Sequence, residues 1–463
     1  MKNQRDTQSV FGWVDNDNMA MLVDLYELTM ADSYFRQKRN DTATFDLFVR
    51  NLPHGRAFLV AAGLPQALAY LQNLRFTEEA LAYLRLIRCM TPGFVDYLRN
   101  FRFSGEVWAL PEGEVFFPPE PLMRVTGPRI EVQIIETFLL NTFNSMSMWA
   151  SKAARITLAA ERRGVIDMSP RRDHGADAAM KVARASYLAG VAGTSNVLAG
   201  HLFGIPTYGT MAHAYVMSFD DELTAFRAFA KDCPANVHLL IDTYDVMSGV
   251  ENAIIVGKEM AERGETLRGV RIDSGDLVAL SRAVRARLDA AGLQHVRILL
   301  SGDLDEYLIT DLLAQGAEVD LFGVGTNLGT SPDDPSLGGV YKLVEDEAGP
   351  RAKLSTGKAT LPGCKQLWRH SSGSGTFEQD TIALADEPPL PDAEPLLVQW
   401  MVNGELVRNV PTLEEARAFC QQRLARLPVD IRRTREYGKY TVEISPALAQ
   451  VRDKAYAELV HSK

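Results

Sequence analysis

The chain has 463 residues, more than one average domain, and its 46% hydrophobic and 23% charged residues are typical of a globular protein with a full core. Acidic residues outnumber basic ones by 59 to 49, and the net charge of -10 argues against nucleic acid or an anionic membrane as a general partner. This balance still allows a local basic pocket for a small anion.

The cysteines lie far apart and form no CxxC pair, which disfavours a zinc site or a disulfide framework and favours a reducing cytosol. They are Cys89, Cys233, Cys364 and Cys420. The polar first eight residues lack the apolar region of a signal peptide, and no uninterrupted apolar run is long enough to span a bilayer. We therefore expect a cytoplasmic protein.

The N-terminal third is predicted to begin with a loose tail of about a dozen residues, followed by helices and short strands. Helices are expected over 19–35, 59–74 and 78–86, a strand over 44–50, and short strands with corners over 107–125. A long helix without Pro or Gly is expected from Ile130 to about Arg163, and it should stop at Gly164.

From Gly164 onward, short β-like runs alternate with helical segments. The expected strands are 165–168, 205–208, 238–242, 270–273, 296–300 and 319–323, with 341–344 as a candidate seventh. The helices between them are expected over 176–188, 222–231, 246–263, 277–290 and 306–314. Repeated βα units indicate a parallel sheet, and their number and even spacing favour a closed or nearly closed barrel over a doubly wound sheet.

The C-terminal part carries loop and hairpin signals. Residues 371–375 are predicted to be a flexible loop, and the Pro-rich residues 388–391 a boundary or rim loop. The Asn-Gly pair within 401–407 predicts a hairpin. Thr412 and Glu415 form a capping box for a helix to about Leu427, and a last strand is expected over 440–444.

The segment from Gly204 to His213 runs from a short apolar piece into a Gly-Thr turn and ends on a histidine beside small residues. Gly209 and Ala212 add little bulk, so a ligand or another backbone could approach closely. A histidine displayed there suits proton or phosphoryl chemistry, because its pKa lies near neutrality. By itself the motif fits a structural histidine better.

Other polar groups follow the predicted strands, and chemistry in a parallel barrel gathers at the carboxyl ends of the strands. The adjacent Arg171 and Arg172 fit a bound anion, and a solvated charge cluster explains them equally well. The small polar turn 190–196 could contact a ligand or only end a helix. The remaining strand ends carry Asp242 to Asp245, Arg271 to Asp276, Ser301 to Asp303, and Phe322 to Asn327.

This inventory of arginines, acids, small hydroxyls and Gly-rich turns predicts a phosphorylated or pyrophosphorylated small-molecule substrate at a barrel rim. The glycines of 322–327 could let backbone N–H groups cradle a phosphate, and barrels of this type often bind phosphate after their late strands. Carboxylates could hold Mg²⁺ together with substrate phosphates. The sequence contains no Ser-His-Asp triad spacing, no Walker A motif, and no GxGxxG that opens a βα unit.

With these residues in hand, the chain resembles the nicotinate phosphoribosyltransferase family over nearly its whole length. The resemblance rests on DLYELTM (24–30), GTSN (193–196), GTMAH (209–213), RIDSGD (271–276), FGVGT (322–326) and LPGCK (361–365). It implies the type II phosphoribosyltransferase fold, an irregular α/β barrel plus an α+β domain assembled from both chain ends. The expected parts are an N-terminal α+β domain (1–150), the catalytic barrel (151–395) and a C-terminal segment (396–463) that packs with the N-terminal domain.

The resemblance also implies an activity: transfer of phosphoribosyl from phosphoribosyl pyrophosphate to the ring nitrogen of nicotinate, giving nicotinate mononucleotide and pyrophosphate in NAD salvage. ATP hydrolysis would drive the reaction through a phosphohistidine, with Mg²⁺, which makes the expected enzyme an ATP-dependent ligase. A homodimer with sites near the subunit interface is expected, and neither nucleic acid nor membrane is an expected partner.

Residue roles follow from the same resemblance. His213 is expected to be the phosphorylated residue. Tyr26, Thr210 and Arg271 are expected to contact nicotinate, with Arg271 as a candidate partner for its carboxylate. Arg171 would contact the ring or a phosphate.

The other roles concern phosphate, ribose and specificity. Asp273 and Asp303 would hold ribose or metal-bound pyrophosphate, and Gly323, Gly325 and Thr326 would cradle the 5′-phosphate. Relatives usually have a Phe-Gly pair before the double arginine, where this chain has Met168-Ser169-Pro170, so the roles of Arg171 and Arg172 stay open.

Two related enzymes compete with this interpretation. Nicotinamide phosphoribosyltransferases carry an Asp where this chain has Ser195, and an anionic side chain there would repel the carboxylate of nicotinate. Ser195 therefore favours the acid. Quinolinate phosphoribosyltransferases have shorter chains and need no phosphohistidine, so the GTMAH motif argues against them. A non-catalytic metabolite-binding protein is a third possibility, which the intact set of rim residues disfavours.

Overall fold

The computed structural model describes residues 12–355 and 360–461, so the predicted N-terminal tail lies almost entirely outside the described residues. The chain divides into two compact units. Unit 1 comprises residues 1–148, 336–431 and 438–463, and unit 2 comprises residues 149–335 and 432–437. Helix α7 (Glu136–Ala159) contributes residues to both.

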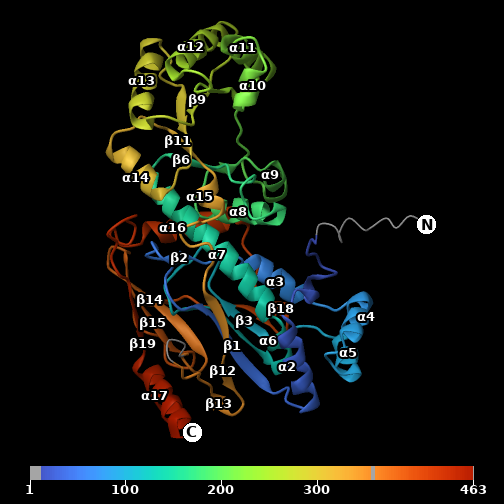
Figure 1. Cartoon of the computed structure of the whole chain (residues 1–463). Coiled ribbons are helices and arrows are strands. Elements are labelled where there is room, and N and C mark those ends of the chain that lie inside the picture. The colour runs from blue at the N-terminus through green and yellow to red at the C-terminus, as the bar shows by residue number, and fades with distance from the viewer. Residues whose placement is uncertain (1–11, 356–359, 462–463) are drawn as a thin grey trace, which may run out of the picture. The chain divides into compact units, whose positions relative to one another are not determined.

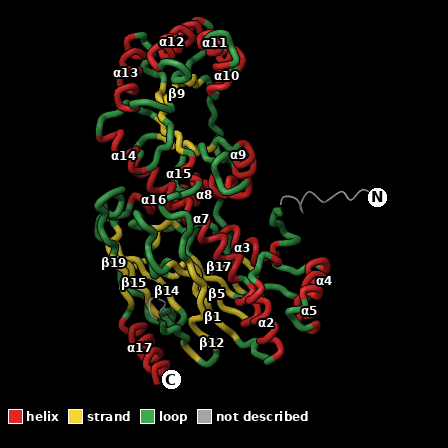
Figure 2. Tube along the Cα trace, viewed as in Figure 1, coloured by secondary structure: helices red, strands yellow, loops and turns green. Residues whose placement is uncertain are grey.

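Unit 1 is built on a seven-stranded sheet with the strand order β13-β12-β1-β5-β3-β17-β18. These strands are β1 (Thr42–Val49), β3 (Glu106–Ala109), β5 (Pro121–Pro128), β12 (Gly339–Asp346), β13 (Gly349–Pro350), β17 (Val398–Val402) and β18 (Glu405–Leu406). Strand β1 pairs antiparallel with β5 and with β12, and β3 pairs with β17, so both ends of the chain build one sheet. Figure 2 labels four of its yellow strands, β1, β5, β12 and β17.

A four-stranded sheet, a two-stranded sheet and several helices complete unit 1. The strands are β2 (Leu59–Val60) paired with β4 (Val115–Phe116), and β14 (Lys365–Ser371), β15 (Phe377–Leu384), β16 (Ala393–Pro395) and β19 (Thr441–Ile444). The helices are the 3₁₀ turn η1 (Met19–Met21), α2 (Leu25–Arg36), α3 (Leu64–Asn73), α4 (Glu78–Ile87), α5 (Pro92–Leu98), α6 (Arg129–Ile134), α16 (Leu413–Ala425) and α17 (Pro446–His461). Residues 371–375, predicted as a flexible loop, lie at the β14–β15 connection.

Unit 2 contains a six-stranded parallel sheet with the order β7-β6-β11-β10-β9-β8. The strands are β6 (Gly164–Asp167), β7 (Gly193–Thr194), β8 (His238–Leu240), β9 (Gly269–Ile272), β10 (Arg297–Leu300) and β11 (Leu321–Val324). Its core includes Ile166, Leu299 and Leu321. This curled parallel sheet is an incomplete barrel, and together with the mixed sheets of unit 1 it confirms the predicted irregular α/β barrel with an added α+β domain.

Helices connect the strands of unit 2. They are α8 (Ala176–Leu188), α9 (Val197–Phe203), α10 (His213–Met217), α11 (Glu222–Asp232), the 3₁₀ turn η2 (Pro234–Asn236), α12 (Val246–Glu262), α13 (Leu277–Ala290), α14 (Glu306–Ala314) and α15 (Thr326–Gly329). Helix α12 packs between α11 and α13, and contacts β9 (Figure 1). No helix of the described residues is both long and apolar enough to cross a membrane.

Two predicted barrel strands are wrong. Residues 205–208 form no strand. Thr207 makes a single parallel bridge to Thr194, and the edge strand is β7 instead. Pro206 lacks an N–H and contributes only its carbonyl, which accepts from the Thr194 N–H at 3.0 Å. The candidate seventh strand, 341–344, is part of β12, which pairs with β1 in unit 1.

Three predicted helices are also partly wrong. The helix predicted over 19–35 is interrupted after η1, and α2 begins only at Leu25. Leu59 and Val60 form strand β2, and α3 begins only after Gly63, whose φ of +107° ends the preceding segment. The helix predicted over 130–163 is two helices, α6 and α7, separated at Ile135, and it ends at Ala159. The hairpin at Asn403-Gly404 and the capping box of Thr412 and Glu415 are confirmed.

Candidate functional site

The polar groups predicted at the strand ends of unit 2 line two adjoining cavities. The first, of about 500 Å³, is lined by Met168, Arg171, Ser195, Tyr208, Gly209, Thr210, Met211, Ala212, His213, Leu240, Arg271 and Asp273. The second, of about 290 Å³, is lined by Met168, Arg171, Arg172, Arg271, Asp273, Ser301, Gly302, Asp303, Gly323, Gly325 and Thr326. Both cavities therefore share Met168, Arg171, Arg271 and Asp273.

Nearly all the predicted site residues are brought together in this way. The first cavity collects the histidine, the threonine and the serine, and the second collects the glycines, Thr326 and Asp303. Tyr26 is the exception. It lies on α2 of unit 1, where its side chain is 45% exposed.

Arg271 connects the two cavities. Its side chain comes from β9 and its Nε donates to Ser301 Oγ at 2.8 Å. Nη2 donates to Asp273 Oδ1 at 2.6 Å, and Nη1 donates to Thr210 Oγ1 at 3.3 Å. These three contacts fix the plane of the Arg271 guanidinium. A fixed guanidinium plane can recognise a planar carboxylate or a phosphate.

The Asp273 carboxylate is held ionised. Burial acts to raise its pKa, but the hydrogen bond from Ser301 Oγ at 2.5 Å and the charge and hydrogen bond of Arg271 outweigh burial and lower the pKa. The electrostatic interaction with His213 also lowers the Asp273 pKa. Asp242, after β8, supports the segment by accepting from the Asp273 N–H at 2.9 Å and from Ser274 Oγ at 2.8 Å.

His213 is the first residue of helix α10 and is partly exposed at the first cavity. Its Nδ1 lies 3.2 Å from Thr243 Oγ1, so a hydroxyl after β8 orients the imidazole ring. Apart from Gly209 itself and its two chain neighbours, no heavy atom of the described residues lies within 4 Å of the place a Cβ on Gly209 would occupy. This wall of the cavity is therefore open for a ligand.

Two glycines allow close approaches around the second cavity, one between the segments after β9 and β10 and one between β11 and the residue after β6. A Cβ on Gly302 would lie 2.2 Å from the Asp273 carbonyl oxygen, and its φ of +105° disfavours any side chain. A Cβ on Gly323 would lie 2.6 Å from Met168 Sδ. Larger residues at these positions would push apart the segments that form the second cavity.

Sequence reasoning missed the apolar part of the lining, and it grouped Thr243 with the strand ends without assigning it to the histidine. Met168 and Leu240 contribute apolar surface, and Thr243 contacts His213. Leu240 is the last residue of β8 and Met168 directly follows β6. Their positions at strand ends are the signal that could have identified them, but apolar residues there are not distinguishable from ordinary core residues.

Carboxylates are available here for a metal ion bound with a substrate. Asp273 and Asp303 line the same cavity, and carboxylate oxygens are the ligands that Mg²⁺ prefers. Among the described residues there is no cluster of three or more His, Cys, Asp or Glu side chains that could hold a metal ion alone. This donor set fits Mg²⁺ that arrives with phosphate oxygens.

Comparison with known protein families identifies the chain. Residues 164–342 match the nicotinate phosphoribosyltransferase (NAPRTase) family, residues 21–144 match its N-terminal domain, and residues 391–452 match its C-terminal domain. The chain belongs to the nicotinate phosphoribosyltransferase family. The matched regions include the strand ends that form both cavities.

Individual members of the nicotinate phosphoribosyltransferase family agree over most of the chain. Nicotinate phosphoribosyltransferase pncB2 of Mycobacterium tuberculosis is 47% identical over 428 residues, covering 92% of this chain and 91% of that protein. The Bacillus subtilis nicotinate phosphoribosyltransferase is 43% identical over 81% of this chain and 78% of its own. The human nicotinate phosphoribosyltransferase is 35% identical over 92% and 95%.

Solved structures related to the nicotinate phosphoribosyltransferase family share the fold. The crystal structure of human nicotinic acid phosphoribosyltransferase superimposes with a TM-score of 0.82 and 33% identity, covering 93% of this chain and 99% of that one. A nicotinate-nucleotide pyrophosphorylase from Pyrococcus furiosus gives a TM-score of 0.73 at 24% identity over 92% and 99%, which shows the fold alone.

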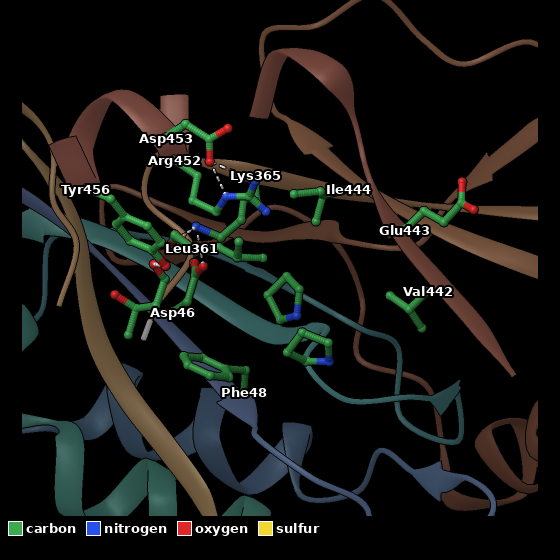
Figure 3. Close-up of a pocket in the computed structure, with 13 residues that line it drawn as sticks. Asp46, Phe48, Leu361, Lys365, Val442, Glu443, Ile444, Arg452, Asp453 and Tyr456 are labelled. Carbon is green, nitrogen blue, oxygen red and sulfur yellow. Dashed lines mark hydrogen bonds and ion pairs between the residues drawn. The ribbon is translucent and has the colours of Figure 1, made fainter. Parts of the chain in front are cut away.

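A separate cavity of about 910 Å³ lies within unit 1 (Figure 3). It is lined by a buried ion pair, Asp46 with Lys365 of the LPGCK motif at 2.9 Å, and by apolar groups such as Phe48 and Ile444. Lys365 also donates to the carbonyls of Leu361 and Gly363. None of the predicted site residues lines this cavity.

Proposed function

We propose that this family member transfers the phosphoribosyl group of phosphoribosyl pyrophosphate to the ring nitrogen of nicotinate, and that ATP hydrolysis drives the transfer through a phosphohistidine at His213. The observation that carries this proposal is the pair of adjoining cavities joined by Arg271 and Asp273. One cavity has the size and the arginine for a pyridine carboxylate. The other has glycines and arginines suited to a phosphate.

The transfer itself needs little acid–base chemistry from the protein. The nitrogen of nicotinate has a free lone pair, so a C–N bond forms as the C1–O bond to pyrophosphate breaks. Ribose C1 becomes oxocarbenium-like between these events. The protein must position both reactants and stabilise charge, which Arg271, Asp273 and backbone amides can do from the positions described above.

Nicotinate is assigned to the first cavity. Arg271 would bind its carboxylate, with Thr210 beside it and Arg171 contacting the ring or a phosphate. Ser195 lines this cavity and places no carboxylate at the position where an Asp would favour an amide donor. Tyr26 of unit 1 is proposed to contact nicotinate on the basis of its DLYELTM motif, and the proposed dimer offers a second source for that tyrosine.

Phosphate and ribose are assigned to the second cavity. Gly323, Gly325 and Thr326 would surround the 5′-phosphate, and Asp303 would hold ribose or the metal-bound pyrophosphate. Asp273 and Asp303 would hold Mg²⁺ together with the pyrophosphate, and the ion would supply positive charge that stabilises the leaving group.

Energy coupling is assigned to His213. An imidazole nitrogen would attack the γ-phosphorus of ATP, so an N–P bond forms, the bond to the β-phosphate oxygen breaks and ADP leaves. Water would later accept the phosphoryl group. Thr243 holds the ring for this step, and the site lies in the cavity proposed for nicotinate, so hydrolysis can respond to substrate occupancy. The enzyme would then be an ATP-dependent ligase.

A single assay separates the proposed donors. Purified protein is incubated with phosphoribosyl pyrophosphate, Mg²⁺ and ATP, and with either nicotinate or nicotinamide. We expect nicotinate mononucleotide to form with release of pyrophosphate and ADP, and far slower reaction of nicotinamide. Equal or faster turnover of nicotinamide would contradict the assignment of the acid. Nicotinate turnover that is the same with and without ATP would contradict the ligase class.

A further inference from the structure

Three side chains around the Arg171–Arg172 pair in the sequence form a hydrogen-bonded series: Asp167, Ser169 and Asp173. Asp167 Oδ1 accepts from Ser169 Oγ at 2.6 Å, and Asp173 Oδ2 lies 3.1 Å from the same Ser169 Oγ. Asp167 and Ser169 are both fully buried, and Asp173 is partly buried. Ser169 belongs to the Met168-Ser169-Pro170 segment that stands where relatives usually have a Phe-Gly pair.

In this series the Ser169 hydroxyl has one hydrogen to donate, but two carboxyl groups lie within reach of its oxygen. Ser169 Oγ can donate to only one carboxylate, so its second short contact needs a hydrogen on one of the acids. Asp167 is already an acceptor on both oxygens, because Ser169 N–H reaches Oδ1 at 2.9 Å and Thr194 Oγ1 reaches Oδ2 at 2.7 Å. The hydrogen therefore belongs on Asp173, which would donate to Ser169 Oγ.

Asp173 also lies against the segment proposed to bind phosphate. A Cβ on Gly329 would lie 1.8 Å from Asp173 Oδ1, so the carboxyl group packs on the backbone of α15. Helix α15 begins at Thr326, directly after Gly325 of the second cavity. Asp173 Oδ1 is buried and has no hydrogen-bond partner within residues 12–355 and 360–461.

The charged groups that act on Asp173 come from two directions. Asp167, at the end of β6, raises its pKa, and His174 on the same turn lowers it. Helix α15, with the sequence Thr-Asn-Leu-Gly, contributes no charged side chain. Burial is the largest cause, and it raises the pKa of Asp173 to about 6 despite the hydrogen bond with Ser169.

We propose that Asp173 is a positioning residue for phosphate binding: in its protonated form it ties the Arg171–Arg172 turn to Ser169 and Asp167, and in its ionised form it releases that tie and places a negative charge beside α15. Both consequences weaken the binding of a phosphate next to Gly325 and Thr326. The inference rests on the proposed function for the location of the 5′-phosphate, but it can be tested without turnover.

The test uses direct binding of ribose 5-phosphate, measured by calorimetry at pH 5 and pH 8 for the wild type and for Asp173→Asn. Asparagine keeps a donor for Ser169 and cannot ionise. The ligand's own phosphate titrates equally in both proteins, so the ratio of their Kd values isolates Asp173. We expect the wild-type Kd divided by the variant Kd to rise about 3- to 10-fold from pH 5 to pH 8.

Two further variants complete the test. Asp177→Asn, an exposed aspartate on the first turn of α8, should keep the wild-type pH dependence. Ser169→Ala removes the partner of the tie. Compared with the wild type, it should weaken binding at pH 5 and have little effect at pH 8, where ionised Asp173 has already released the tie. This variant also decides the matter if Asp173→Asn does not fold.

A Kd ratio between wild type and Asp173→Asn that stays constant from pH 5 to pH 8 would overturn the inference, because a merely structural residue changes affinity equally at both pH values. Nicotinate turnover is measured in parallel on the same proteins. If the Kd ratio changes as expected but nicotinate is not turned over, the proposed function fails and the role of Asp173 in phosphate binding stands.

Discussion

Arg271 Nη2 donates to Asp273 Oδ1 at 2.6 Å, and one residue separates the two at the end of β9. Alternate residues of a strand project to the same face, so the pair extends from one edge of the sheet into the same space. Each residue lines both cavities, and the pair thus forms the boundary that the two proposed substrates share.

Replacing Arg271 should therefore affect nicotinate more than an uncharged donor. For Arg271→Ala we expect the KM for nicotinate to rise about 10- to 100-fold, because one charge-assisted hydrogen-bonded contact is lost. The KM for nicotinamide should rise less. Steady-state kinetics with both donors measures this. Arg287→Ala, an exposed arginine on α13, is the control. Equal KM increases for the two donors would mean that Arg271 binds a phosphate instead.

Removing the hydroxyl of Ser301 should shift the pH dependence of the reaction. The Asp273 pKa is lowered in part by the Ser301 hydrogen bond, so its ionised form is present down to acid pH. In Ser301→Ala that bond is absent and the Asp273 pKa rises. The acid limb of the pH profile of kcat/KM should then move to higher pH, while the alkaline limb stays in place. An unchanged acid limb would show that Asp273 ionisation does not control activity.

His213→Ala should separate energy coupling from nicotinate binding. With γ-labelled ATP, the wild type should acquire an acid-labile, base-stable label, and the variant should acquire none. Nicotinate binding should persist in His213→Ala, because Arg271 and Thr210 remain. Thr210→Val is the complementary variant, with weakened nicotinate binding and retained label. Label that persists in His213→Ala would assign phosphorylation to another residue, such as His174 or His201.

Glu27, next to Tyr26 on α2, should make folding stability fall with rising pH. Its side chain is fully buried, and burial raises its pKa to about 8 although hydrogen bonds from Thr137 oppose the shift. The folded protein thus keeps a proton that the unfolded chain has lost above about pH 4.5. The free energy of unfolding should decrease as pH rises from about 4.5 to 8, by roughly 4 kcal/mol at most.

The matched pair for this prediction is Glu27→Gln and Glu79→Gln. Glutamine at position 27 keeps an acceptor for Thr137 but cannot ionise, so urea unfolding at pH 5 and pH 8 should show a smaller pH dependence than the wild type. Exposed Glu79 on α4 should leave the dependence unchanged. Equal slopes for wild type and Glu27→Gln would contradict the buried, protonated state of Glu27.

The fold was predictable from the sequence where periodicity and local signals agree. Most of the predicted alternation of strands and helices between Gly164 and Val324 is correct, because parallel strands buried on both faces form short apolar runs. Residues 205–208 form no strand, and β7, α9 and α10 were not predicted. Where long-range pairing decides, prediction fails. Val60 is apolar in a helix-like run but pairs with Val115, and the run 341–344 fits a barrel strand as well as it fits β12.

The candidate site was predictable as a set of strand ends but not as a geometry. That the ends of parallel strands meet at one edge is a property of the fold, so Arg271, Asp303 and Gly325 could be grouped from the sequence alone. The sharing of Arg271 and Asp273 between two cavities depends on side-chain directions. The packing of Asp173 on Gly329 depends on a contact between residues 156 positions apart, and no local pattern encodes it.

The most direct test of the central claim is a crystal structure of this protein with nicotinate mononucleotide bound. The account predicts the pyridine carboxylate against the Arg271 guanidinium in the cavity that contains Thr210 and His213, and the 5′-phosphate against Gly323, Gly325 and Thr326. A phosphate on Arg271 with the pyridine ring placed elsewhere would contradict it.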